Sequence, residues 1–410
     1  MDRRTFVSGC AASASFLAVP TARALGANDR IRFGLIGAGD RGRIDLKEAL
    51  SRLNVECVGV ADVYSRSRDQ AKVMAPNASM YDDAQRLLDR KDVDAVIIAT
   101  PLFLHSKYFQ MALAAGKDVY CEKTMTWDIA EAAACRRAAD ASSHVVQVGV
   151  QHESDGAHTD AKRWVIEGLP GKITMIEAWM SRNSARGKPQ WRRPLPADCD
   201  AGHVNYDLFL SGRPKEAFSA ERFINWRLYW EFSGGNVTEN MVHQIAWITS
   251  VMGIKEPIAA YMTGGVFSEK DGREVPDTIA VTLEYPGLTV LWQSTFSNTR
   301  YGLGEHFLGS DGTIEHVSGA TDMATGKYAG GCYFYPEKVN SPSGATLSSQ
   351  SETVNHMQNW FDCIRSRNKQ TNAPVEIGYL SAVAGHMANL SYRAKRRVTF
   401  EEALTITQIY

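Results

Sequence analysis

The sequence predicts an α/β domain with a parallel sheet, followed by an α+β domain whose sheet is mostly antiparallel. First, strand and helix patterns alternate from residue 31 to about residue 151, and the strands are continuous apolar runs, as in parallel sheets covered on both faces. Second, the later strands are longer and alternate between polar and apolar residues, and Pro-Gly and Asp-Gly pairs separate them. Third, 410 residues exceed the size of one ordinary domain.

Each expected element follows from its own pattern. Apolar runs predict strands of the first domain at residues 31–36, 55–61, 94–100, 118–121 and 145–150. Helical spacing between these runs predicts helices at residues 41–53, 65–74, 105–115 and 128–141. In the second domain we expect strands at residues 173–180, 279–285 and 289–296, and helices at residues 157–168, 356–367 and 377–394. Residues 181–232 are aromatic and basic with little periodicity, which indicates a long functional loop.

Composition excludes several classes of protein. The chain is 44% hydrophobic and 22% charged, as in ordinary globular proteins, and its formal net charge of -1 gives no basic excess for nucleic acid. Seven cysteines occur without a C-x-x-C pair, so neither a zinc site nor a redox dithiol is expected, and no metal is predicted. No stretch beyond the N-terminal segment approaches the roughly 18 apolar residues of a membrane-spanning helix, so no stable membrane insertion is expected.

Residues 1–28 have the features of a targeting segment. Arg3 and Arg4 lie in a twin-arginine motif, a mild apolar stretch follows at residues 10–19, and Ala22 and Ala24 form a small-x-small cleavage site. We therefore expect a twin-arginine signal peptide and export of the folded protein to the periplasm.

A G-x-G-x-x-G motif formed by Gly37, Gly39 and Gly42 follows an apolar strand and opens a helix, which is the context of a dinucleotide-binding turn. The first glycine permits the tight turn, the second permits approach of the pyrophosphate, and the third permits close packing of the helix on the strand. Asp62 ends the second strand, where a carboxylate accepts hydrogen bonds from the adenosine ribose, which favours NAD. Arg66 can instead meet a 2′-phosphate, so NADP remains an alternative.

Three side chains are candidates for the chemistry. Lys123 follows the strand expected at residues 118–121, and ligands bind at the carboxyl ends of parallel strands. Glu239 and His243 are four residues apart in an expected helix, so they share a face, and a histidine beside a carboxylate is suited to accept a proton from an alcohol. We expect Glu239 to orient the imidazole and to hold its pKa near neutrality. Alternatively, Glu239 points at the substrate and binds a hydroxyl.

These motifs, together with the Ala-Thr-Pro run that ends at Pro101, resemble the Gfo/Idh/MocA family of oxidoreductases, from about residue 29 to residue 400. The resemblance implies a Rossmann domain at residues 29–151. At residues 152–410 it implies a substrate domain with an open, mainly antiparallel sheet through which copies associate as homo-oligomers. The C-terminal helices can pack back on the Rossmann domain. The residues that we expect to bind NAD(P) are Gly37, Gly39, Arg41, Gly42, Asp62, Thr100, Pro101, His105, Glu122, Lys123 and Gln151.

The resemblance also implies that Lys123 and His243 flank the reacting hydroxyl group. Two positions depart from the family pattern. Thr124 stands where the family usually has a proline, which often follows a cis peptide bond, so the local turn is left open. Glu239 stands where the family usually has an aspartate, and its longer side chain can contact a different group of the substrate.

The long loop, with the end of the strand before it, supplies candidates for a sugar site. Aromatic side chains cover the apolar faces of pyranose rings, and arginines donate to hydroxyl groups. The same side chains can instead be interdomain core or dimer contacts. The candidates are Arg182, Trp191, Trp226, Arg227 and Tyr229.

We therefore expect an NAD(P)-dependent oxidoreductase that acts on a secondary alcohol of a sugar or glycoside. Outside the cytoplasm no free nicotinamide pool is expected, so the cofactor should be tightly bound and returned to its starting state in each cycle. One alternative is a nicotinamide-dependent glycosidase that uses transient C3 oxidation, elimination, hydration and re-reduction. A second alternative is a non-catalytic carbohydrate-binding protein, against which Lys123 and His243 argue.

Overall fold

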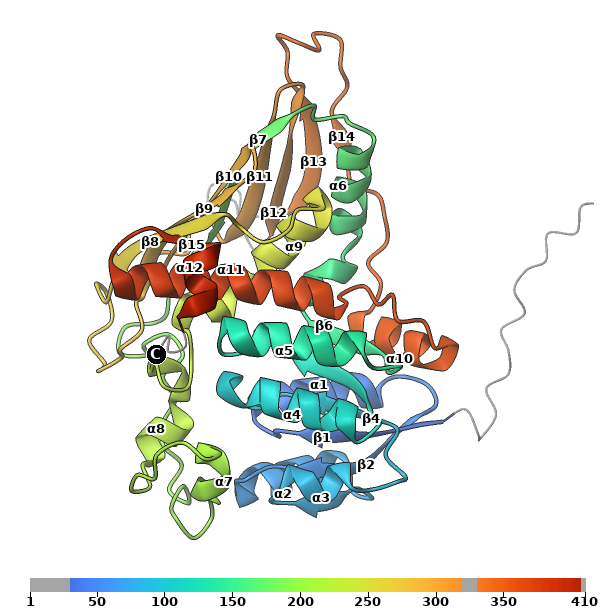
Figure 1. Ribbon diagram of the computed structural model, residues 1–410, viewed down its shortest axis with the longest axis vertical. Helices are drawn as coiled ribbons and strands as arrows, with labels where there is room; N and C mark the ends of the chain where they lie inside the picture. Colours follow the sequence, from blue (N-terminus) through green and yellow to red (C-terminus); the bar gives the residue numbers. More distant parts are fainter. Residues whose placement is uncertain (1–29, 319–329, 407–410) are drawn as a thin grey trace, which may run out of the picture.

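The computed structural model describes residues 30–318 and 330–406, so the expected signal segment lies outside the described residues (Figure 1). The first domain is a six-stranded parallel sheet with the order β3-β2-β1-β4-β5-β6, the doubly wound arrangement that the alternating pattern predicts. Its strands are β1 (Ile31–Ile36), β2 (Val55–Ala61), β3 (Ser79–Tyr81), β4 (Ala95–Ile98), β5 (Asp118–Glu122) and β6 (Val146–Gly149).

Helices cover both faces of this sheet. Alternate residues of β4 enter two different apolar cores: Val96 and Ile98 belong to one cluster, and Ala95 and Ile97 to the other. This two-sided burial explains why the strands are continuous apolar runs. The helices of the domain are α1 (Asp40–Leu50), α2 (Ser65–Met74), α3 (Ala84–Leu88), α4 (His105–Ala114) and α5 (Ile129–Asp140).

The second domain contains a nine-stranded mixed sheet with the order β14-β13-β12-β11-β7-β10-β9-β8-β15. All its strand pairs are antiparallel except β7 with β10, which confirms the expected, mainly antiparallel sheet. Its strands are β7 (Ile173–Met180), β8 (Ala259–Gly265), β9 (Thr278–Tyr285), β10 (Leu288–Thr295), β11 (Leu303–Gly309), β12 (Gly312–Ser318), β13 (Gly331–Pro336), β14 (Leu347–Ser348) and β15 (Val398–Thr399).

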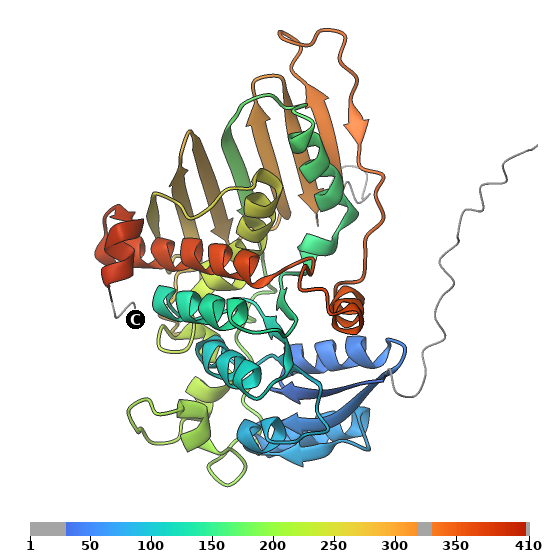
Figure 2. The ribbon, with the colours of Figure 1, turned by 45° about the vertical axis from the view of Figure 1, so that its right-hand side comes forward.

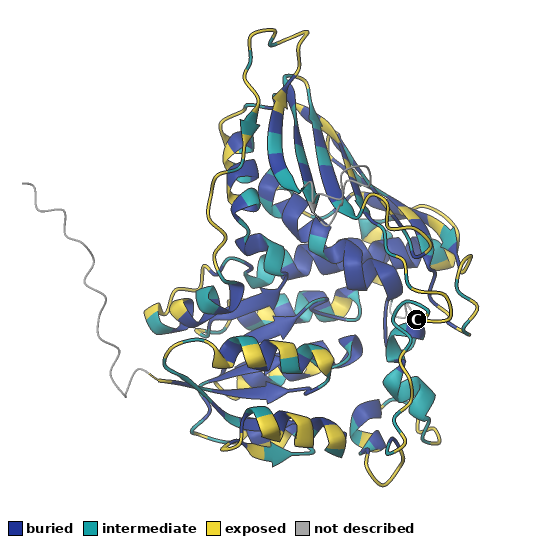
Figure 3. Cartoon of the chain, turned by 180° about the vertical axis from the view of Figure 1, so that it is seen from behind, coloured by how far each residue is buried: buried dark blue, intermediate teal, exposed yellow. Residues whose placement is uncertain are grey.

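Helices α6 (Gly156–Ile166), α9 (Val242–Met252) and α11 (Val375–Ala394) lie along one face of this sheet (Figure 2). Residues such as Ile176 and Val290 are buried beneath them, whereas Glu177 and Gln293 alternate with the buried set and are exposed. Figure 3 shows buried and more exposed positions alternating along the strands of this sheet. Helix α11 runs between the two sheets and contacts β8, β6 and α5 (Figure 1).

Two segments of the second part of the chain pack on the Rossmann domain. Helix α10 (His356–Ser366) places Trp360 and Phe361 in the same apolar cluster as Phe33 of β1. The expected long loop contains short helices α7 (Tyr206–Leu210) and α8 (Ala220–Ile224), which lie beside the Rossmann domain (Figure 1). Within the described ranges, no helix is long and apolar enough to cross a membrane.

Candidate active site

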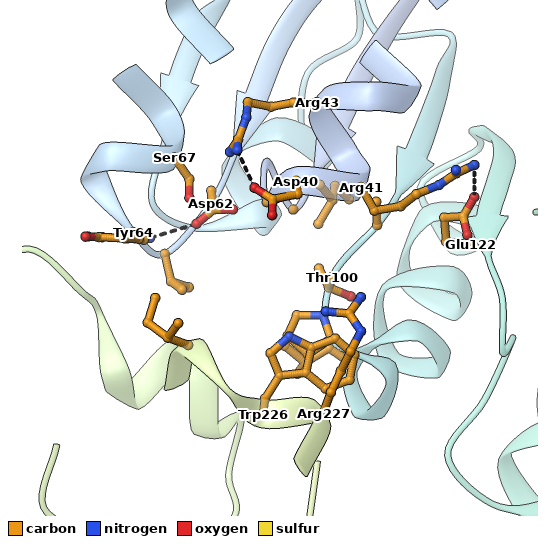
Figure 4. Close-up of a pocket in the computed structure, with 18 of the residues that line it drawn as sticks. Asp40, Arg41, Arg43, Asp62, Tyr64, Ser67, Thr100, Glu122, Trp226 and Arg227 are labelled. Atoms are coloured by element: carbon orange, nitrogen blue, oxygen red, sulfur yellow. Dashed lines mark hydrogen bonds and ion pairs between the residues drawn. The ribbon is translucent and has the colours of Figure 1, made fainter. Parts of the chain in front are cut away.

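A cavity of about 750 Å³ lies between the Rossmann domain and the segment at residues 181–232 (Figure 4). The glycine-rich turn and Asp62 lie along one side, and Trp226 and Arg227 lie on the side opposite the turn (Figure 4). The other expected site residues that line it are Arg41, Thr100, Pro101, His105, Glu122, Lys123, Gln151, Arg182, Trp191, Glu239 and His243.

Two positions of the glycine-rich turn, Gly37 and Gly42, leave no room for a side chain. Gly37 has φ +89°, and a Cβ atom there would lie 2.7 Å from the backbone of Thr100. A Cβ atom at Gly42 would lie 1.9 Å from the carbonyl oxygen of Gly37, so this glycine serves the packing of α1 and does not line the cavity. Gly39 lines the cavity, and a Cβ atom there would meet nothing within 4 Å. This open space above the N-terminus of α1 fits a pyrophosphate.

Asp62 lines the cavity at the end where the adenosine of a cofactor is expected. Its Oδ2 accepts a hydrogen bond from the backbone N–H of Ala38 at 2.6 Å, and its Oδ1 accepts one from that of Tyr64 at 2.8 Å. Burial raises the pKa of Asp62, against the effect of these two N–H groups. Each carboxylate oxygen keeps a second lone pair, so ribose hydroxyls can still donate to it. Arg66 is the residue that could instead meet the 2′-phosphate of NADP. Its guanidinium forms an ion pair of 3.2 Å with Asp198.

An ionic network joins the glycine-rich turn to the strand that precedes Lys123. The guanidinium of Arg41 contacts Glu122 at 2.7 Å and the fully buried Asp45 at 2.9 Å. Glu122 also accepts a hydrogen bond of 2.8 Å from the side chain of Gln151. The network fixes the end of β5 relative to the turn, so Arg41, Glu122 and Gln151 hold the cavity wall where the nicotinamide half of a cofactor is expected.

Lys123 and Glu239 meet across the cavity. The ammonium group of Lys123 donates to the backbone carbonyl of Glu239 at 2.7 Å and to its carboxylate at 3.1 Å. Arg227 Nε contacts the same carboxylate oxygen at 3.3 Å. Burial opposes ionisation of Glu239, but the charges of Lys123 and Arg227 outweigh it and hold the pKa of that carboxyl at about 2. The peptide bond between Lys123 and Thr124 is cis.

The expected pairing of Glu239 with His243 is wrong. Glu239 binds Lys123 and Arg227 instead, and Nδ1 of His243 is buried without a hydrogen-bond partner in the described part of the chain. Burial, followed by the positive charge of Lys123, lowers the pKa of His243 well below its ordinary value of 6.5. The imidazole is therefore neutral at neutral pH, and it is not held near its own pKa by a carboxylate.

The local helix geometry explains the error. Residues Val237–Met241 form a π-helical turn with i→i+5 hydrogen bonds, and α9 begins only at Val242. The i,i+4 relation that aligns side chains on an α-helix therefore does not apply between Glu239 and His243. Thr238 lies inside this turn, and its hydroxyl donates to the carbonyl of Gly235.

Several expected residues hold the site from behind or lie outside it. His105 is buried, and its ring nitrogens lie 2.7 Å from the Thr124 carbonyl and 2.8 Å from the Thr100 carbonyl, so it fixes two loops of the cavity wall. Trp191 lines the cavity and packs edge-to-face on Phe296. Tyr229 does not line the cavity, because its hydroxyl donates to Glu221.

Sequence reasoning missed other residues of the cavity wall. Arg43 donates to the Ala38 carbonyl at 2.7 Å, and Arg193 forms an ion pair with Asp40 at the start of α1. For Arg193, the only indication in the sequence was that it lies in the basic, aromatic segment at residues 181–232. No feature of the sequence distinguished Arg43 from a surface arginine. In the described residues, no group of three or more His, Cys, Asp or Glu side chains could hold a metal ion.

Comparison with known proteins agrees with this architecture. Residues 31–150 match the model of the Gfo/Idh/MocA oxidoreductase family for its NAD-binding Rossmann fold, and residues 202–400 match the model for the family's C-terminal α/β domain. These matches cover most of the chain and define an oxidoreductase with a nucleotide-binding domain and a separate α/β domain. The chain belongs to the Gfo/Idh/MocA family.

Individual relatives are more distant. An inositol 2-dehydrogenase of Gluconacetobacter diazotrophicus is 32% identical over 160 residues, and this match spans 38% of the chain and only 46% of the relative. A glycosyl hydrolase family 109 protein of Stenotrophomonas maltophilia is 27% identical over 345 residues, which are 76% of the chain and 73% of the relative. The WlbA dehydrogenase of Bordetella pertussis, solved with NADH and UDP-GlcNAcA, superimposes with a TM-score of 0.65 at 19% identity, covering 90% of the chain and 98% of that structure.

Proposed function

We propose that the protein is an NAD-dependent oxidoreductase that oxidises a secondary alcohol of a sugar, cyclitol or glycoside. One observation carries the proposal: a single cavity joins the glycine-rich turn and Asp62 at one end to Lys123 and His243 at the other. The inositol 2-dehydrogenase relative supports an alcohol of this class. When bound, NAD supplies the acceptor for the hydride.

The residues at the reacting end have complementary tasks. A lysine ammonium has three N–H groups, and two of them bind Glu239, so the third is free for the oxygen of the substrate. The neutral imidazole of His243 takes the hydroxyl proton as the carbinol carbon loses hydride and becomes a ketone. Because Nδ1 is buried, Nε2 is the nitrogen that can receive this proton. Lys123 stabilises the negative charge that develops on the oxygen.

A substrate screen tests the proposal and separates it from its alternatives. Purified protein is incubated with sugars, cyclitols and chromogenic glycosides while the absorbance of reduced nicotinamide and the release of aglycone are followed. Reduction of the cofactor by one sugar and its reoxidation by a second supports the oxidoreductase with an internally recycled cofactor. Aglycone release supports a glycosidase, which the long match to the family 109 relative favours. A protein that binds sugars without either signal would be a carbohydrate-binding protein.

Replacement of Asp62 tests the preference for NAD. We expect Asp62→Ala to weaken NAD binding by about 10- to 100-fold, because two ribose hydroxyls lose a charged acceptor. NADP should gain relative to NAD, since the negative charge that repels a 2′-phosphate is gone. Fluorescence titration with both nucleotides measures the change. Asp62→Asn keeps one of the two acceptor oxygens that bind the backbone N–H groups of Ala38 and Tyr64, so it separates loss of the charge from loss of the whole side chain. Weaker NADP binding with unchanged NAD binding would reverse the assignment.

A strap over the adenosine end supports tight retention of the cofactor. Residues 194–205 form this strap, which pairs with the Rossmann domain at Tyr64 and Val204 and accepts a backbone hydrogen bond from Ser65 at His203. Asp198 of the strap accepts a hydrogen bond of 2.7 Å from the Tyr64 hydroxyl. Pro194 and Pro196 line the same cavity as Asp62, so a bound adenosine is enclosed between the strap and the Rossmann domain.

Opening of the strap should control release of the cofactor. We expect Asp198→Ala to accelerate NAD dissociation about five- to tenfold, because it removes an ion pair with Arg66 and a hydrogen bond from Tyr64. Stopped-flow displacement of bound NADH measures this rate. Asp207→Ala is the matched control. Asp207 lies just beyond the strap, in α7, and is an exposed carboxylate whose only ion pair among the described residues is with Lys215. Equal rates in both variants would remove the strap from cofactor retention.

Export and assembly belong to the same proposal. Twin-arginine export carries folded protein, so a retained cofactor can travel with the chain, and the mature protein should begin near Leu25. N-terminal sequencing of periplasmic protein tests this, and an intact Met1 on a cytoplasmic pool would contradict it.

We further infer that copies associate through the exposed face of the nine-stranded sheet, where Met175, Tyr261 and Tyr335 are partly exposed.

A further inference from the structure

The reacting end of the cavity carries an excess of positive charge. Lys123 and Arg227 share a single carboxylate, that of Glu239, so this trio has a net charge of +1. Arg182 also lines the cavity, and no carboxylate of the described residues lies within ion-pair distance of it.

The other arginines of the cavity wall have carboxylate partners of their own. Arg41 forms ion pairs with both Glu122 and Asp45, so its guanidinium has two carboxylate partners. Arg193 pairs with Asp40 at the glycine-rich turn. Of the arginines that line the cavity, Arg182 is therefore the one that forms no ion pair within the described residues.

The half-buried side chain of Arg182 has few polar partners. Its backbone N–H donates to the Thr295 carbonyl, which anchors the residue just beyond the end of β7. Its Nη2 contacts only the sulfur of Met180 at 3.6 Å, and its Nε is buried without a hydrogen-bond partner in the described residues. Burial lowers the pKa of Arg182, and Glu239 is the carboxylate that acts against this shift. A partly buried cation without an ion-pair partner is poorly stabilised, so an anionic ligand would complete the site.

We propose that the substrate is a sugar acid or acidic glycoside whose carboxylate binds Arg182 while its reacting hydroxyl lies between Lys123 and His243. This inference rests on the proposed function and names the class of its substrate. The planar guanidinium fork of arginine matches a carboxylate through two parallel hydrogen bonds, which a neutral hydroxyl cannot reproduce. Cofactor phosphates have their own site, because the open space at Gly39 lies beside Arg43 and beside Arg193, which reaches Asp40 from the segment at residues 181–232.

Matched probes test this assignment on the NAD-loaded protein. The probes are the methyl glycosides of glucuronic and galacturonic acid, the corresponding uronamides, the parent glucosides and galactosides, and hexose phosphates. We expect at least one acid to bind about tenfold or more tightly than its amide, because a charged hydrogen bond is replaced by a neutral one. Arg182→Gln should abolish this preference, and Arg182→Lys should retain only part of it. Arg186→Gln, an exposed arginine of the same segment, should leave it unchanged.

The outcomes separate this inference from the proposed function. If no acid binds better than its amide, or if hexose phosphates are preferred to uronates, the carboxylate assignment is wrong, even where a neutral sugar reduces NAD. If acids bind in a manner that depends on Arg182 but no sugar reduces NAD, the carboxylate site stands and the redox proposal fails. If Arg182→Gln weakens NAD binding as much as it weakens binding of the acids, this arginine would be assigned to the cofactor and the inference would be overturned. Thermal unfolding of each variant confirms that the fold is retained.

Discussion

Replacement of Lys123 by alanine is expected to lower kcat by about 10²- to 10³-fold, the usual effect of removing one preorganised donor to a developing oxyanion. KM should change little, because the third N–H of this ammonium gains most of its strength when negative charge appears on the substrate oxygen. The other two N–H groups are already committed to Glu239 at 2.7 and 3.1 Å, which fixes the direction of the third. Single-turnover reduction of NAD by the best sugar of the screen measures the effect.

Two controls show whether the loss of turnover comes from the chemical step. Lys172→Ala removes an exposed lysine at the start of β7 and should leave turnover unchanged. NAD affinity of Lys123→Ala, measured by fluorescence, should stay within a few-fold of the wild type, because the glycine-rich turn and Asp62 are intact. Near-normal turnover in Lys123→Ala would remove this lysine from the chemistry.

The Rossmann domain was predictable because each of its main elements is encoded locally. Strands buried on both faces must be apolar throughout, and the helices between them keep a 3.6-residue period, so the two patterns cannot be confused. The short strand β3 and helix α3 were missed, because three and five residues are too few to establish a period. Asp62 was found since its position depends only on where β2 ends.

For Lys123, Glu239 and His243, the sequence indicated side chains that line one cavity but did not indicate their partners. Lys123, Glu239 and His243 all line the cavity, yet Glu239 binds a lysine 116 residues away instead of the histidine four residues away. This pairing depends on how the π-helical turn presents the side chain to the other domain, and local sequence carries no signal for that. The sequence also could not show that Arg182 lacks an ion-pair partner, because this depends on where the fold places the surrounding carboxylates.

Replacement of His243 by asparagine is the second large effect that we expect, a loss of about 10²- to 10⁴-fold in hydride transfer, because an amide cannot accept the proton. NAD should remain bound with near-normal affinity, since its expected contacts lie in the other domain. His306→Asn is the matched control, because His306 lies on β11, outside the cavity. Stopped-flow reduction of bound NAD, together with a binding titration, separates the chemical step from cofactor binding.

The pH profile of the wild-type enzyme provides an independent test of His243. A base must be deprotonated to act, and burial and the charge of Lys123 lower the pKa of His243 well below 6.5. The acidic limb of kcat/KM should therefore lie below pH 6.5, and activity should persist as the pH falls from neutrality until that lowered pKa is reached. Lys123→Ala should move the limb to higher pH, because the charge that disfavours imidazolium is removed. Glu239 does not contribute to this limb, since its pKa is about 2. An acidic limb near or above 6.5 that does not respond to Lys123→Ala would show that another group is the base.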